Sequence, residues 1–437
     1  QLQDRHRMLE QQKLTQEFPG RDAATNSFEQ KLNHNDAADM RTFKQRYWTD
    51  DGYGAQNSSP TVLFLCGEWR CSNSEFISIN DISRKLKAHM VVMEHRYYGT
   101  SQPFAELTTE NLKYLTTSLA LEDFAKIENH IQKTRKWTGP WVVVGGSYSA
   151  SLAAYYRLKY PKLARAAWAS SGPVRAEDNF EEYDLHVNQT LGKQCADRVR
   201  YAFTTIEKQV GNEAGMLPYK KMFEAEALKN DVDFLYLLAD TAAAAAQYGA
   251  QQSFCNYLNQ TDAITGYAQY VLTMYQNWGM DALSLSVESA QDLNPDHYEH
   301  AGFRQWYYQS CTEYGYWQNA YHDPSLATRS QKINAEYHRN ICKRLFNINP
   351  NGPDAINEAF YSPLLNEASQ IFFSNGSNDP WSLLSISDLN GNNVNTKNVS
   401  FMIEGAAHCD DLSAGNGSAS MQAAHQALFE NLSHWIQ

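Results

Sequence analysis

The chain has 437 residues and a formal net charge of −12, because 37 lysines and arginines face 49 aspartates and glutamates. Apolar residues make up 43% of the sequence and aromatic residues 13%, enough for a large core, which excludes a disordered or fibrous chain. Nucleic acids and anionic membranes need a basic surface, so we expect neither as a partner. No apolar stretch reaches the roughly 18 residues of a membrane-spanning helix, so we expect no membrane span.

The first 175 residues alternate between short apolar runs and helical patterns. Strands are predicted at about 28–32, 43–48, 61–66, 90–94, 141–145 and 164–170. Helices are predicted at about 119–136, where apolar residues recur at helical spacing, and from just after Ser147 to about Tyr160. Strands that alternate with helices favour a mostly parallel sheet covered on both faces.

The pattern changes at about residue 175 and changes back at about residue 300. The intervening segment is helical, rich in alanine, glutamine, tyrosine and aspartate, and carries almost no strand signal. Strands are then predicted again at 303–309, 371–374 and 399–403. We therefore expect residues 1–175 and 301–437 to form one α/β domain, and residues 176–300 to form an inserted helical cap over the carboxyl edge of its sheet.

Cysteines and glycosylation sequons indicate an oxidising, glycosylating route, so we expect the secretory pathway, either an acidic lysosome-like vesicle or the extracellular space. Six sequons are candidate glycan acceptors: Asn57, Asn188, Asn259, Asn398, Asn416 and Asn431. A seventh, Asn375, lies beside a candidate catalytic residue and is not expected to carry a glycan. No two of the seven cysteines form a CxxC pair, which argues against a zinc or thioredoxin site. We expect neither a metal nor a cofactor.

The central motif is Gly145-Gly146-Ser147-Tyr148-Ser149, which follows a predicted buried strand and opens a helix. This context is typical of a nucleophile elbow, where a serine occupies a sharp strand-to-helix turn with small neighbours. The backbone N–H of Tyr148 would then face a developing oxyanion at the helix N-terminus. Without that context the same residues would indicate only a tight turn.

A nucleophilic serine needs a base, and the base needs an orienting acid, in the chain order serine, acid, histidine. Asp379 follows the next-to-last predicted strand by a short polar turn, and His408 follows the last one. Each residue alone would be an ordinary polar loop residue, but their order and spacing predict a Ser147–His408–Asp379 triad. Because the base must be neutral, an acidic working pH would require a depressed His408 pKa.

The sequence resembles the S28 family of serine peptidases, and most closely its thymus-specific branch, from about residue 28 to the C-terminus. Four motifs carry the resemblance: Glu94-His95-Arg96-Tyr97-Tyr98-Gly99, Gly145-Gly146-Ser147-Tyr148, Asn375-Gly376 with Asp379-Pro380-Trp381, and Ala407-His408. It implies an α/β-hydrolase domain with a helical cap, and a peptide substrate cut after proline in a carboxypeptidase or dipeptidyl-peptidase mode. A peptidase of broad specificity and an esterase or lipase are the alternatives, and a homodimer is left open.

Other positions carry weaker expectations. The turn after the first sheet strand offers a second oxyanion donor, the backbone N–H of Gly67 or of Glu68, or is a simple turn. Trp381 is expected to build an apolar pocket for a proline ring. Ser151 stands where proline-specific members of the family carry a methionine, which predicts a wider pocket.

Two further groups of residues have a structural and a functional interpretation. The Glu94-His95-Arg96 run is expected to be an ion-paired brace, and residues 306–309 with Thr312 and Glu313 either line the site or pack in the core. Expected disulfides are Cys66–Cys71, Cys195–Cys255 and Cys311–Cys342, although connectivity does not follow from sequence. An odd number of cysteines leaves at least one thiol free or paired between chains.

Overall fold

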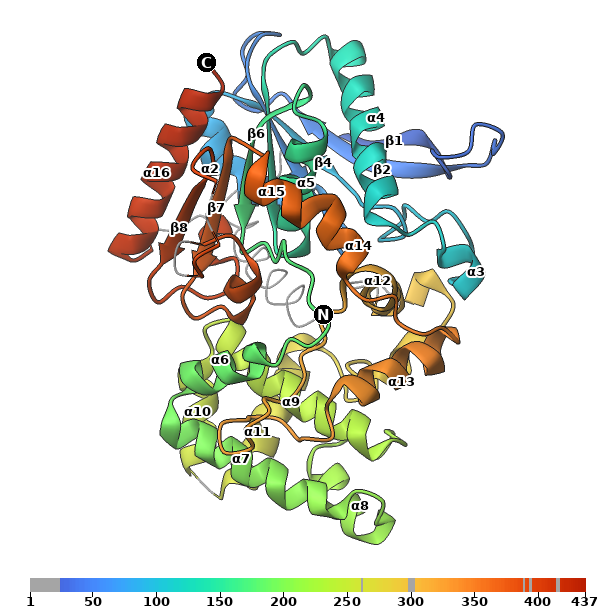
Figure 1. Ribbon diagram of the computed structural model, residues 1–437, viewed down its shortest axis with the longest axis vertical. Helices are drawn as coiled ribbons and strands as arrows, with labels where there is room; N and C mark the ends of the chain where they lie inside the picture. The colour runs from blue at the N-terminus through green and yellow to red at the C-terminus, as the bar shows by residue number, and fades with distance from the viewer. Residues whose placement is uncertain (1–23, 261, 298–302, 388–389, 393–394, 414–416) are drawn as a thin grey trace.

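The computed structural model describes residues 24–260, 262–297, 303–387, 390–392, 395–413 and 417–437. Within these residues one sheet has the strand order β1-β2-β4-β3-β5-β6-β7-β8 (Figure 1). Its strands are β1 Ala24–Lys31, β2 Thr42–Asp50, β3 Thr61–Leu65, β4 His89–Met93, β5 Trp141–Gly146, β6 Ala164–Ser170, β7 Ile371–Gly376 and β8 Val399–Ile403. The pairs β1–β2 and β2–β4 are antiparallel, and all later pairs are parallel. This topology is that of an α/β hydrolase, which confirms the predicted fold class.

The described α-helices lie on the two faces of the sheet and in a separate layer. They are α2 Phe76–Leu86, α3 Thr109–Leu112, α4 Thr117–Arg135, α5 Tyr148–Lys159, α6 Glu182–Leu191, α7 Lys193–Ile206, α8 Glu213–Met222, α9 Asp231–Gln247, α10 Gln251–Gln260, α11 Ala263–Trp278, α12 Phe303–Gln309, α13 Ala335–Phe346, α14 Asp354–Ile356, α15 Ser362–Asn366 and α16 Ala419–Trp435. None of them combines the length and hydrophobicity that crossing a bilayer requires.

The sheet is covered by helices because its central strands are apolar on both faces. All residues of β3, β4 and β5 are buried. Successive side chains point to opposite faces, so Val62 and Phe64 pack with α2 and α16, whereas Leu63 and Leu65 pack with α4 and α5. Two cores, one on each face, therefore fix the plane of the sheet and the loops at its carboxyl edge.

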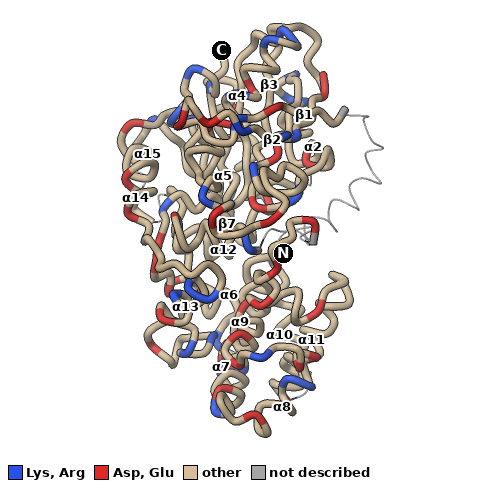
Figure 2. Tube along the Cα trace, turned by 90° about the vertical axis from the view of Figure 1, so that its right-hand side faces the viewer, with Lys and Arg blue, Asp and Glu red and all other residues tan. Residues whose placement is uncertain are grey.

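Helices α6 to α11 leave the sheet after β6 and form a second body, seen below the sheet in Figure 1. Helix α13, which is later in the chain, packs on this body, where Tyr337 and Arg344 donate hydrogen bonds of 2.7 and 3.0 Å to Asp233 of α9. Acidic and basic residues are interspersed along the chain in both bodies (Figure 2). The alanine-rich part of α9 is buried, which lets neighbouring helices approach closely.

The run at 303–309 was expected to be a strand but is helix α12, so that prediction is wrong. Its polar side chains Arg304, Gln305 and Gln309 are buried, so the segment has no separate polar, exposed face. Arg304 donates to the carbonyls of Leu107 at 2.6 Å and Ala290 at 2.9 Å, and Gln305 donates to that of Tyr97 at 2.9 Å. Partners far away in the sequence therefore determine this segment.

Three disulfides join Cys66 to Cys71, Cys195 to Cys255 and Cys311 to Cys342, which are the pairs expected. The first closes the loop after β3, the second links α7 to α10, and the third links the π-turn Ser310–Tyr314 to α13. Cys409 is the free thiol of the described residues, and it is buried. The odd cysteine is therefore shielded from solvent.

The candidate glycan acceptors differ in exposure. Four of them are exposed or half-buried: Asn57, Asn188, Asn259 and Asn431. Asn398 is 4% exposed and its amide donates to the carbonyl of Ala368 at 3.4 Å, so its side chain faces the interior, which does not favour the expected glycan. Asn375 is also buried, and Asn416 lies outside the described residues.

Candidate active site

Ser147 occupies the sharp turn between β5 and α5. Its backbone has φ +61° and ψ −131°, a left-handed conformation that costs free energy for a residue with a side chain. The neighbours must be small, because a Cβ on Gly145 would lie 2.1 Å from the carbonyl oxygen of Ser149. The Ser147 N–H donates to the carbonyl of Ser170 on β6 at 3.0 Å, which holds the turn in place. This is the geometry of a nucleophile elbow.

Asp379 and His408 meet beyond the carboxyl ends of β7 and β8. Asp379 caps the 3-10 turn Pro380–Leu384 through an Oδ1 bond of 2.9 Å from the Trp381 N–H. Its other oxygen, Oδ2, lies 2.7 Å from Nδ1 of His408, and both side chains are fully buried. The His408 backbone N–H donates to the carbonyl of Gln247 at the end of α9, at 2.8 Å, so the cap also positions the imidazole.

The second ring nitrogen of His408 is available for chemistry. Nε2 is buried and has no hydrogen-bond partner among the residues that the structure describes. Burial disfavours the imidazolium ion, but the adjacent Asp379 carboxylate outweighs burial and raises the pKa of His408 above its usual value. An acidic working pH would require a His408 pKa below its usual value. In the structure the pKa of His408 is raised instead, because the buried Asp379 carboxylate lies so close.

Two candidate oxyanion donors lie near Ser147. Tyr148 is the first residue of α5, where backbone N–H groups have no partner within the helix. Gly67 packs against the same turn, since a Cβ added to it would lie 3.4 Å from the backbone nitrogen of Ser149. The next residue, Glu68, lines the cavity described below. The structure thus brings the loop after β3 to the N-terminus of α5.

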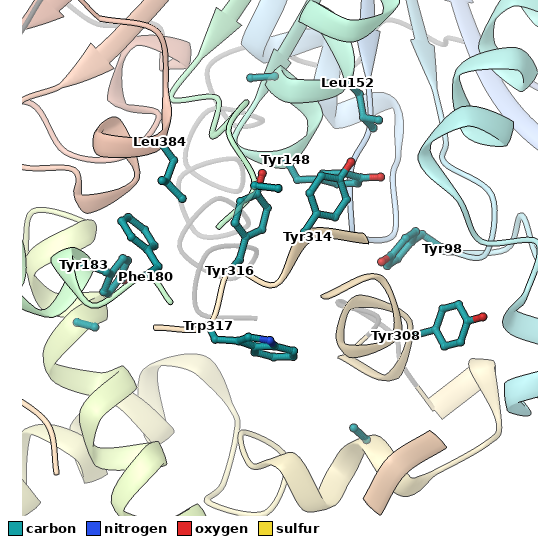
Figure 3. Close-up of a cluster of buried hydrophobic side chains, with 14 of the residues drawn as sticks. Tyr98, Tyr148, Leu152, Phe180, Tyr183, Tyr308, Tyr314, Tyr316, Trp317 and Leu384 are labelled. Carbon is teal, nitrogen blue, oxygen red and sulfur yellow. The ribbon is translucent and has the colours of Figure 1, made fainter. Parts of the chain in front are cut away.

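A buried polar network holds the Tyr148 side chain. Its hydroxyl lies 3.2 Å from Nε2 of His95 and accepts a 2.8 Å hydrogen bond from the Gln309 amide. Gln309 in turn accepts a 2.6 Å bond from the Tyr98 hydroxyl. Tyr148, Tyr314 and Tyr98 lie together behind the elbow (Figure 3). Gln309 therefore belongs to the core, which settles one of the two interpretations for this residue.

The residues on either side of His95 form ion pairs. Arg96 donates to Asp123 at 2.6 and 2.7 Å, and both side chains are fully buried. Glu94 accepts a 2.9 Å bond from Arg46 and a 2.6 Å bond from Ser101. These contacts fit the expected brace, which connects β2 and β4 to the segment leading into α4.

A cavity of about 200 Å³ opens beside Ser147, between the sheet and the cap. Trp381, Trp306 and Tyr307 are among the residues that line it. Trp381 is fixed by a 3.0 Å hydrogen bond from its indole N–H to Oε1 of Gln247. Glu313 does not line the cavity: it is half-buried and accepts hydrogen bonds from the first residue of α4.

Ser151 is not among the residues that line this cavity, and the expectation that it widens the substrate pocket stays a prediction. Ser151 is fully buried within α5. Tyr316 and Pro173 line the cavity instead, and the Tyr316 hydroxyl donates to the Pro173 carbonyl. Ser151 lies one helical turn after Ser147, and its side chain points into the packed domain.

Sequence reasoning missed the cap residues of the site. Helix α9 places Tyr236, Asp240, Ala244 and Gln247 on the cavity wall. Their spacing of about one helical turn places them on one face of the helix, and this spacing is the signal in the sequence. The alanine-rich sequence of this helix offers no motif. No group of three or more histidine, cysteine, aspartate or glutamate side chains within the described part of the chain is arranged to hold a metal ion.

Comparison with known proteins gives a consistent result. The family model described as serine carboxypeptidase S28 matches residues 30–428. A probable serine protease of Arabidopsis thaliana is 36% identical over 81% of this chain and 74% of its own length. The mouse thymus-specific serine protease is 26% identical over 94% of this chain and 87% of its own length. The mouse lysosomal Pro-X carboxypeptidase is 28% identical over 94% of this chain and 88% of its own length. The chain belongs to the S28 family of serine peptidases.

Proposed function

We propose that this protein hydrolyses short peptides through a Ser147–His408–Asp379 triad and an acyl-enzyme. The observation that carries the proposal is the fully buried 2.7 Å contact between Asp379 and His408, with Nε2 of His408 left without a partner among the described residues. Asp379 fixes the tautomer that carries the proton on Nδ1, which leaves Nε2 able to accept the Ser147 proton.

The proposed reaction has two stages. Nε2 of His408 takes the Ser147 proton as Oγ attacks the scissile carbonyl carbon, and then delivers this proton to the departing amine. Water repeats the sequence on the acyl-enzyme and releases the new carboxylate. The N–H of Tyr148 and one N–H from Gly67 or Glu68 would stabilise the oxyanion, each contributing roughly 3 kcal/mol.

We propose that the residue before the cut bond occupies an aromatic pocket around Trp381. The ring centroids of Phe180, Tyr183 and Tyr316 lie 5.5, 5.4 and 5.4 Å from that of Trp381, so the pocket wall is apolar and rigid. Flat aromatic faces suit a proline ring. The relative named Pro-X carboxypeptidase supports acceptance of proline.

The proposed compartment is the secretory route, ending in a lysosome-like vesicle or outside the cell, and the raised pKa of His408 favours the less acidic of the two. Three disulfides form and persist in oxidising compartments. Two sequon asparagines, Asn57 and Asn259, are exposed and can carry glycans. One relative is named as lysosomal.

Covalent labelling tests the proposed chemistry. A fluorophosphonate probe should label the wild-type protein once, at Ser147, and should not label Ser147→Ala. The same variant should lose about 10³-fold or more in kcat while its thermal midpoint stays close to that of the wild type. Ser325→Ala, an exposed serine far from the elbow in sequence, is the matched control. A labelled and active Ser147→Ala would refute the proposal, and turnover of esters without any turnover of peptides would show an esterase instead.

A further inference from the structure

The cavity beside Ser147 carries negative charge and no positive charge on its wall. The charged side chains that line it are Glu68 and Asp240, and no lysine or arginine of the described residues does so. A substrate carboxylate is normally bound by arginine or lysine. The cavity therefore suits a cationic group of the substrate better than an anionic one.

Asp240 reaches this cavity from helix α9. Its side chain is 36% exposed, and its Oδ1 atom is shielded without a hydrogen-bond partner in the described structure. Among the residues that the structure describes, Nη2 of Arg329 lies 3.9 Å from Oδ1, which is too long for a hydrogen bond. Asp240 thus keeps hydrogen-bonding capacity on the cavity wall.

Arg329 is held at its position by other partners than Asp240. Its side chain is 1% exposed, and Nη1 donates to the carbonyl of Gln318 at 2.6 Å. It also lies 3.8 Å from Asp184, which accepts 2.9 Å bonds from the N–H groups of Tyr321 and Thr328. Arg329 is therefore shared between two carboxylates.

The charge balance of this cluster favours the arrival of a cation. Two carboxylates, Asp184 and Asp240, share one guanidinium, so one negative charge remains when both are ionised. Partial burial raises the pKa of Asp240 to about 6, and Arg329 offsets only part of this effect. A cation that entered the cavity would stabilise the ionised form of Asp240.

We propose that Asp240, together with Glu68, binds the free α-ammonium group of the peptide, so that the enzyme cleaves peptides from their N-terminus. This inference rests on the proposed peptidase function and assigns its exopeptidase mode. A peptide docked with its C-terminal carboxylate in the same cavity would meet two like charges and no cation, which is unfavourable. A lysine side chain offers the same ammonium chemistry, and the experiment separates the two sources.

The test uses one short peptide with a fixed cleavage site in four forms: unmodified, N-acetylated, C-terminally amidated, and N-acetylated with an added lysine. Wild-type kcat/KM should fall at least about 10-fold on acetylation, mainly through KM, and should change little on amidation. Asp240→Asn should remove most of this preference for the free amine, and Asp240→Glu should retain part of it. Asp197→Asn, which removes a half-exposed acid on α7, should leave the preference unchanged.

The outcomes separate the inference from the proposed function. Equal rates on free and acetylated peptides, loss of activity on amidation, or full rescue by the added lysine would each overturn binding of the α-ammonium group. An unchanged preference in Asp240→Asn would overturn the role of this residue. Should Asp240→Asn fail to fold, the four peptides with wild-type protein decide the mode. Fluorophosphonate labelling of Ser147 in the same samples reports on the triad independently.

Discussion

Glu128 gives the sharpest prediction about stability. It lies in the middle of α4, is fully buried, and accepts hydrogen bonds from the Tyr156 hydroxyl at 2.7 Å and the Gln132 amide at 3.0 Å. Burial raises its pKa from 4.5 to about 8, and the bond from Tyr156 offsets only part of this effect. The folded protein therefore keeps a proton on Glu128 at pH values where the unfolded chain has lost it.

The sign and size follow from proton linkage. Because the folded state binds the extra proton, Glu128 stabilises the fold fully below pH 4.5, and this stability is lost as the pH rises to about 8. The difference between about 8 and 4.5, at about 1.36 kcal/mol per pKa unit, gives an upper limit of about 5 kcal/mol. That is a large part of the ~5–15 kcal/mol that stabilises a typical domain.

The perturbation is Glu128→Gln, which removes the titration and keeps the shape. A glutamine carbonyl can accept from Tyr156, and its amide can donate to Gln132 once the Gln132 amide flips. We expect the free energy of unfolding of the wild type to fall between pH 5 and pH 8, and that of the variant to fall less. The variant should be the more stable protein at pH 8.

The assay is denaturant unfolding at several pH values with Glu122→Gln as control. Glu122 lies on the same helix but is partly exposed and pairs with Lys126 at 3.5 Å, so its loss should not alter the pH dependence. Parallel curves for wild type and Glu128→Gln would refute the reasoning, because they would show that Glu128 is ionised throughout this range. Glu313, whose pKa burial raises to about 7, should leave a residual slope in both proteins.

Three further predictions concern the proposed triad and Ser151. Asp379→Asn should lower kcat by roughly 10⁴-fold. Because the Asp379 carboxylate raises the pKa of His408, the acidic limb of kcat/KM should move to lower pH in this variant. An acidic limb that stays in place would contradict the role of Asp379. In the wild type, kcat/KM should fall as the pH drops through the His408 pKa, because only the neutral imidazole accepts a proton. Ser151→Met should destabilise the protein by about 1–3 kcal/mol through overpacking. It should leave the ratio of kcat/KM for proline and alanine substrates unchanged. A higher ratio in the variant would show that Ser151 reaches the substrate.

The parts of the structure that local sequence determines could be predicted. Strands β3 to β8 are short apolar runs between polar turns, and all lie within a residue or two of their expected positions. Asp379 and His408 could be located because each follows a strand end directly. The fold then brings them together at 2.7 Å.

The parts that depend on distant partners could not be predicted. The segment of helix α12 was predicted as a strand, but carbonyls from other parts of the chain accept hydrogen bonds from its polar residues. Ser151 has a counterpart by position in the family, but its neighbour Tyr316 comes from far along the chain and covers it. Asp240 lies in an alanine-rich helix with no motif. The packing of the cap on the sheet brings it to the cavity wall.

The path of the chain also decides when the site can exist during synthesis. Ser147 is made early, on β5, whereas β7 pairs with β6 only after the cap has been made, joining Ala167 to Ile371. Bringing together ends that lie about 200 residues apart carries a loop-closure cost, which a folded cap reduces by shortening the free chain. Under the proposed mechanism, a nascent or truncated chain therefore carries the serine without its base. With the proposed triad, hydrolytic competence would be acquired last, when the final strands join the sheet.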